Sequence, residues 1–120
     1  MGDASQIVPL TVIQGATLTR QITWLSPSGN PVNLTGYTAD MQFRSTVQDT
    51  GAPIIEVSTG NGGIVINPSA GTVTFTISST TTSALSDGQT MVYNLFLTSG
   101  TGVVVPLMAG PAYVQGSTIR

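Results

Sequence analysis

The sequence predicts an all-β fold, an antiparallel β-sandwich of seven to nine strands with at most one short helical turn. Apolar residues recur at every second position with threonine between them, as where Val73, Phe75 and Ile77 alternate with threonines. Turns that contain glycine or proline separate such segments at intervals of about 8–12 residues. The 120-residue chain is long enough for one domain with a single core between two layers.

The N-terminal part predicts an arm and a long strand. Residues 1–14 are expected to form an N-terminal arm with a first strand at Val8–Val12, and residues 15–120 the sandwich domain. A strand at Ala16–Leu25 follows and contains Trp24, the only tryptophan, which we expect to fill the core rather than to form a ligand platform. Pro27–Pro31 then has the composition of a hairpin-type turn.

The rest of the chain continues the strand pattern. Glycines in 60–63 and in 68–71 supply positive-φ turn positions, and 99–102 joins two strands as a hairpin. Residues 79–88 favour a single helical turn with a hydroxyl as N-cap and Gly88 as its stop. Short strands at this spacing are typical of an immunoglobulin-like sandwich. The further strands are expected at Tyr37–Ser45, Ile54–Ser58, Gly63–Ile66, Thr72–Ser78, Met91–Ser99, Val103–Met108 and Ala112–Gln115.

The composition excludes most functions that need charge or catalytic side chains. Only 7% of residues are charged, against about 25% in a typical soluble domain, and the net charge is −2. Because His, Lys and Cys are absent, we expect no enzyme activity, metal site or cofactor. Three arginines do not supply the basic face that nucleic acid requires. The chain also lacks the apolar run of roughly 18–20 residues that spans a membrane, and its N-terminus lacks a secretion signal.

Two arginines and the N-terminal arm are the candidate interface residues. Arg20 falls in phase with Leu18 and Ile22 on the core face, so its head is expected either to reach the sandwich edge or an acid, or to anchor an interface. Arg44 lies on a polar strand face, where Asp40 or Glu56 are its expected partners. The low charge gives little protection against self-association, which predicts a homo-oligomer. The full candidate interface set is Ile7, Val8, Pro9, Leu10, Arg20 and Arg44.

Two stretches carry a resemblance to a known group of proteins. They are 15–24 and 29–44, the second with the step Asn-Leu-Thr-Gly-Tyr at 33–37, and shorter matches follow at 61–64, 71–75, 84–88 and 92–95. The chain resembles small virion proteins of tailed bacteriophages and is similar, over about residues 15–115, to the N-terminal domain of the baseplate upper protein. In this step Leu34 would fill the core, Gly36 would permit a tight bend, and Tyr37 would start the next strand. The structural positions are Trp24, Pro31, Leu34, Gly36, Tyr37, Phe43, Phe75 and Tyr93.

The resemblance implies a structural role in a virion assembled in the host cytoplasm. The baseplate upper protein continues into regions that bind receptor-recognition parts, whereas this sequence stops at Arg120, so we expect the domain itself to act as an adaptor. A tail, baseplate or fibre-attachment adaptor is favoured over a capsid cement (decoration) protein, and head or tail is left open. The expected partners are other virion proteins and further copies, reached through apolar burial, strand edges and the N-terminal arm. A carbohydrate- or cell-surface-binding module is the alternative from another class.

Overall fold

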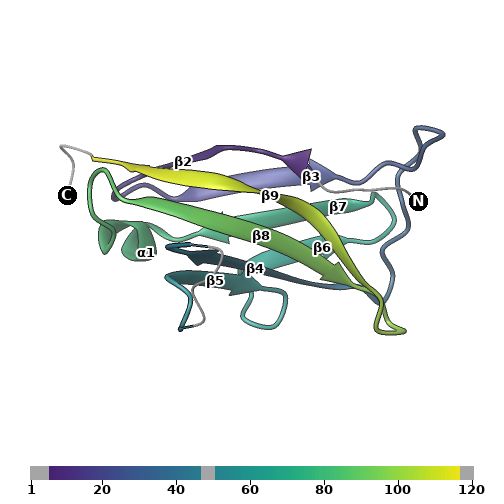
Figure 1. Cartoon of the computed structure of the whole chain (residues 1–120). Helices are drawn as coiled ribbons and strands as arrows, with labels where there is room; N and C mark the ends of the chain where they lie inside the picture. The colour runs from purple at the N-terminus through teal and green to yellow at the C-terminus, as the bar shows by residue number, and fades with distance from the viewer. Residues whose placement is uncertain (1–5, 47–50, 117–120) are drawn as a thin grey trace.

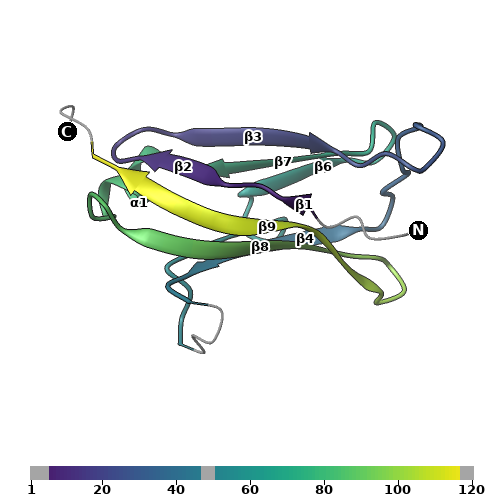
Figure 2. The same cartoon turned by 45° about the horizontal axis from the view of Figure 1, so that its top comes forward.

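The computed structural model describes residues 6–46 and 51–116, which form two β-sheets packed face to face (Figures 1 and 2). The described part contains nine strands and one short helix, α1 (Ser79–Ser83), so the predicted all-β sandwich is confirmed. The order of strands within the two sheets is that of an immunoglobulin-like fold. The first sheet consists of β1 (Gln6–Ile7), β2 (Leu10–Ile13), β9 (Val104–Gln115), β8 (Thr90–Thr98), β4 (Thr38–Arg44) and β5 (Ile55–Ser58). The second sheet consists of β3 (Leu18–Thr23), β7 (Thr72–Ile77) and β6 (Ile64–Asn67).

The core lies between the two sheets and is built from the alternate apolar residues of both. The Phe43 and Tyr93 rings from the first sheet are in contact, with centroids 5.3 Å apart. Trp24 meets Tyr37 edge to face at 6.2 Å, at one end of the sandwich. Of the predicted structural positions, Trp24, Leu34, Phe43, Phe75 and Tyr93 are buried. Tyr37 is half-buried against the core, Gly36 has a φ of 82°, and Pro31 is exposed in a bridge to Leu25.

The expected N-terminal arm is part of the sandwich from residue 6 onward. Both β1 and β2 pair with β9 in parallel, which departs from the otherwise antiparallel pairing. Leu10 and Val12 on β2 are only 1% and 0% exposed, so Leu10 is a core residue and its assignment as an interface residue was wrong. Residues 6–13 therefore pair with β9 of their own chain, whereas the sequence predicted an arm that reaches another subunit. Residues 1–5 lie outside the described part.

A proline-rich junction explains why β1 and β2 are separate strands. Val8 and Pro9 lie beside Gly110 and Pro111 of β9, and neither proline has the N–H that a continuous ladder needs. Gly110 allows the two backbones to approach closely, because a Cβ at this position would lie 2.7 Å from the Val8 oxygen. The parallel pairing resumes at Leu10 opposite Ala112.

Other boundaries differ from the predictions for local reasons. The expected strands at 103–108 and 112–115 form the single strand β9, with an irregularity in its register where β8 passes from Leu95 to Phe96. Helix α1 begins after Ser78, whose Oγ accepts the backbone N–H of Thr81 at 3.2 Å. It ends at Ala84 rather than at Gly88, which instead forms part of the turn before β8. No helix in the described ranges has the length and hydropathy needed to cross a membrane.

Buried Thr82 connects α1 to the turn between β2 and β3. Its hydroxyl donates to the carbonyl oxygen of Ala16 at 2.9 Å and accepts the N–H of Gly15 at 3.1 Å. Thr82 is the one buried polar side chain among the described residues. Because both contacts reach backbone groups of the turn, the short helix holds β2 and β3 in place at one end of the sandwich.

Candidate binding face

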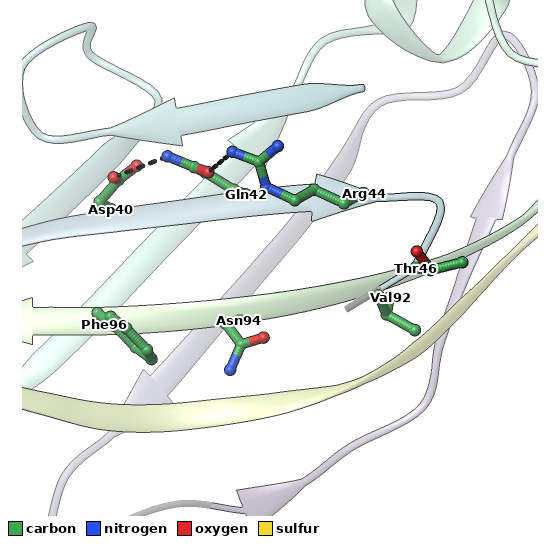
Figure 3. A pocket seen from close by; sticks show the side chains of 7 residues that line it. All are labelled: Asp40, Gln42, Arg44, Thr46, Val92, Asn94 and Phe96. Atoms are coloured by element: carbon green, nitrogen blue, oxygen red, sulfur yellow. Dashed lines mark hydrogen bonds between the residues drawn. The ribbon is translucent and has the colours of Figure 1, made fainter. Parts of the chain in front are cut away.

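The outward side of the first sheet, which faces away from the core, carries a groove between strands β4 and β8. On β4, the buried residues Ala39, Met41 and Phe43 alternate with outward-pointing polar residues. On β8, four buried residues alternate with outward residues in the same way. Figure 3 shows the resulting groove between the two strands, with a volume of about 270 Å³. It is lined by Asp40, Gln42, Arg44, Thr46, Val92, Asn94 and Phe96.

A hydrogen-bonded polar network occupies the β4 side of this groove. The Gln42 Nε2 group donates to Asp40 Oδ2 at 3.2 Å and to Glu56 Oε2 at 3.1 Å, so one amide bridges two carboxyl groups. Its Oε1 atom accepts a hydrogen bond of 2.7 Å from Arg44, as Figure 3 shows. Arg44 also donates to the carbonyl oxygen of Gly51. The sequence predicted Asp40 or Glu56 as the partner of Arg44, and in the structure Gln42 accepts a hydrogen bond from Arg44 and donates to both carboxyl groups.

The environment of Asp40 in the network shifts its pKa. Partial burial raises the pKa of Asp40 above its ordinary value, and the negative charge of Glu56 raises it further. Hydrogen bonds from Gln42 and from the backbone oppose this shift. The face therefore carries two carboxyl groups beside Gln42, with Arg44 four residues after Asp40 on the same strand.

Exposed apolar side chains also lie on β8 and β9, and one of them, Phe96, pairs with Asp40 of the network across the β4–β8 ladder. Phe96 is 41% exposed, Val104 53% and Tyr113 48%, and all three belong to the first sheet. The two exposed aromatic residues of this face, Phe96 and Tyr113, were not singled out from the sequence. The signal was available in the alternation, because Phe96 lies between buried Leu95 and Leu97 and must point to the opposite side.

The remaining candidate interface residues lie at the side of the sandwich, away from this face. Ile7 is 75% exposed, Val8 is half-buried and Pro9 is exposed. Arg20 pairs with buried Phe75 across the β3–β7 ladder, so its strand position faces inward as predicted, but its side chain is exposed. Together with Val8 and residues of β2, β3 and β9, Arg20 lines an opening of about 330 Å³ between the two sheets.

Tyr93 connects the core to this lateral opening. Its hydroxyl donates to the Val8 carbonyl oxygen at 2.6 Å and so fastens the segment between β1 and β2. Burial raises the pKa of Tyr93 to about 12, although the positive charge of Arg20 acts in the opposite direction. The tyrosine is therefore a neutral hydrogen-bond donor at physiological pH.

Within residues 6–46 and 51–116, no group of three or more His, Cys, Asp or Glu residues is arranged to hold a metal ion. The face combines exposed apolar side chains, primary amides and separated charges of both signs.

Comparison with known proteins finds solved structures that match at very low sequence identity and with TM-scores below 0.5. No family model and no curated protein matches the chain. Among solved structures, the chicken CNTN1 FN1–FN3 domains match 93% of this chain with 14% identity and a TM-score of 0.46. This chain spans only 33% of that one. A VGSC β subunit, studied for multimeric cell-adhesive interactions, matches 98% of this chain and 95% of its own length, with 12% identity and a TM-score of 0.46.

A third structure, murine CRIg, matches 92% of both chains with 14% identity and a TM-score of 0.42. Identities of 12–14% bear on the fold alone. By the arrangement of its strands in two sheets, the chain has an immunoglobulin-like β-sandwich fold.

Proposed function

We propose that the protein is a non-enzymatic structural component of a tailed-phage virion, acting as an adaptor in the tail, the baseplate or the attachment of fibres. The observation that carries the proposal is the exposed outer face of the first sheet, where Phe96 lies opposite Asp40 of the polar network and Val104 and Tyr113 are exposed toward the two ends of β9. Contiguous exposed apolar patches rimmed by polar residues mark surfaces that bind other proteins. The resemblance of 15–24 and 29–44 to phage virion proteins supports the choice of a virion as the assembly.

The composition supports an assembly role over catalysis. The chain has no His, Lys or Cys, and 7% charged residues leave a surface that is neutral and rich in hydroxyl and amide groups. Such a surface lacks the electrostatic repulsion that keeps free monomers apart. Assembly into a particle would bury this surface and so prevent free copies from associating in an uncontrolled way.

Quantitative mass spectrometry of purified phage particles tests the proposal. We expect the protein in a fixed ratio to the known structural proteins, at a copy number compatible with the symmetry of a tail or baseplate. Gold labelling of a tagged copy then separates tail from head, and label on the capsid would favour a cement protein. If washed particles contain only trace amounts that vary between preparations, a structural role in the virion is refuted.

One observation favours a carbohydrate- or cell-surface-binding module as a second candidate. Phe96 and Tyr113 expose their rings on one face of the sheet, and exposed rings are common platforms for sugars. A glycan array probed with the protein and with its Phe96→Ala variant tests this function. Binding that depends on Phe96 would support the module, and an array without signal would leave the virion proposal alone.

A further inference from the structure

The outward residues of three neighbouring strands form an ordered pattern. Residues paired across a ladder point to the same side of a sheet, so β4, β8 and β9 together present five rows. All of these residues are exposed or half-buried. The rows are Thr38, Thr98 and Val104; Asp40, Phe96 and Pro106; Gln42, Asn94 and Ala109; Arg44, Val92 and Pro111; and, on β8 and β9 only, Thr90 and Tyr113.

The pattern is symmetric in chemical type about its middle row. Along β8 the outward residues read Thr, Val, Asn, Phe, Thr, with polar ends, apolar neighbours and a central amide. Along β9 they read Val, Pro, Ala, Pro, Tyr, with large apolar ends and a central alanine. Along β4, the central amide Gln42 has the acid Asp40 on one side and the base Arg44 on the other.

A two-fold axis along the middle row would bring unlike charges together. If two copies stack with these faces in contact, the second row of one copy lies over the fourth row of the other. Asp40 then faces Arg44 of the second copy, and the symmetric contact repeats it. Glu56 pairs with Gln42 across the β4–β5 ladder and therefore lies in the middle row, where it faces its own counterpart in the second copy.

The remaining contacts of the same arrangement are also complementary. Phe96 faces Val92 of the second copy, and Tyr113 faces Val104, so exposed apolar groups cover one another. Gln42 and Asn94 face their own counterparts, and a primary amide both donates and accepts hydrogen bonds, so it can pair with itself. Among the described residues of the face, the charged ones lie on β4 and β5, because β8 and β9 contain none.

We propose that the outer face of the first sheet is a two-fold homodimer interface, in which Asp40 of each copy meets Arg44 of the other. The dimer assigns a partner, a second copy of the chain, to the face named under the proposed function. It rests on that function only in treating the face as an interaction surface. Arg44 donates hydrogen bonds to Gln42 and Gly51 within its own chain. It can keep these bonds while its positive charge attracts Asp40 of the second copy, because a guanidinium group has several N–H donors.

The size of the face sets the expected strength of the dimer. Three strands about 4.8 Å apart, each about 27 Å long over the five rows, give a flat area of roughly 14 by 27 Å. This is below the roughly 800 Å² per partner of a standard stable interface. We therefore expect a reversible dimer with a Kd of about 1–100 µM, which a particle with many copies would reinforce.

Charge reversal at the two positions tests the interface. Asp40→Arg makes both charges positive and Arg44→Asp makes both negative, so each variant alone should raise the dimer Kd at least tenfold in sedimentation velocity. An equimolar mixture of the two variants should form a heterodimer, because each position then faces the opposite charge. Thr76→Arg, on the outer side of the second sheet, is the matched control and should dimerise like the wild type.

Crosslinking provides a readout that does not depend on altering charge. Asn94 lies on the proposed axis, and the chain contains no other thiol once Asn94→Cys is introduced. Stacked sheets lie about 10 Å apart, too far for a disulfide, so a short bismaleimide should join two Asn94→Cys copies. Thr76→Cys should give no crosslinked dimer.

The outcomes separate this proposal from the virion proposal. A wild type that stays monomeric at millimolar concentration, a variant mixture no better than either variant, or equal crosslinking of both cysteine variants would overturn the dimer. A dimer in solution with no protein in purified particles would refute the virion role and leave the interface standing.

Discussion

Gly110→Ala should destabilise the fold through one close approach between two backbones. An added Cβ would lie 2.7 Å from the carbonyl oxygen of Val8, closer than real Cβ atoms come, and 3.1 Å from its carbonyl carbon, which is also a tight contact. The Val8 segment must therefore move away from β9. Two hydrogen bonds are lost with it, from Tyr93 Oη to the Val8 oxygen (2.6 Å) and from the Val8 nitrogen to the Ala109 oxygen (2.8 Å).

The expected loss follows from these contacts. The two hydrogen bonds contribute about 1 kcal/mol each, and a side chain at a φ of +153° adds about 1 kcal/mol of backbone strain. Gly110→Ala should thus lower the free energy of unfolding by about 3 kcal/mol. Gly102→Ala is the control, because its φ is +92° with nothing within 4 Å of the added Cβ, so only the strain of about 1 kcal/mol applies.

Urea denaturation of the two variants measures this difference directly. Hydrogen exchange should also show that the Val8 amide loses its protection in Gly110→Ala and keeps it in Gly102→Ala. If Gly110→Ala is no more destabilising than Gly102→Ala, the close approach does not hold the N-terminal segment and the reasoning is refuted.

Three further predictions concern single side chains. Tyr93→Phe should cost about 1 kcal/mol through the lost bond to Val8, and should remove the phenol that titrates at about 12 in an absorbance titration; an unchanged titration curve would contradict this. Thr82→Val should cost about 1–2 kcal/mol in urea denaturation, because two backbone groups lose their partner, whereas exposed Thr80→Val should be neutral. The raised pKa of Asp40 means that the folded state binds the proton more tightly, so this group's contribution to stability falls as pH rises through that pKa. Asp40→Asn should therefore gain stability relative to the wild type between pH 3 and pH 7, by about 0.5 kcal/mol or less because the group is largely exposed; a loss would contradict the sign.

Much of the local structure could be predicted because alternation is a property of neighbouring residues. Strand positions such as Phe43, Phe75 and Tyr93 follow from apolar residues at every second place, and each is buried. The same alternation placed Arg44 on the outer side of its strand and Arg20 in phase with the core. The all-β class and the number of strands needed no information beyond spacing and turn residues.

The candidate face could not be predicted, because it depends on which strands lie side by side. Asp40 and Glu56 come together only through the pairing of β4 with β5, and Phe96 joins them only through the pairing of β4 with β8. Sequence spacing alone gives no register between such strands.

The N-terminal segment shows the same division between local and long-range information. The apolar residues of 7–12 could be recognised, but whether they cover a neighbour or their own core was decided by the parallel pairing of β2 with β9. That pairing joins residues about a hundred positions apart and depends on Gly110 leaving room for Val8. The sequence by itself thus determined the strands and the faces they offer, whereas only the tertiary structure decided which faces are covered, because burial depends on contacts between residues far apart in the chain.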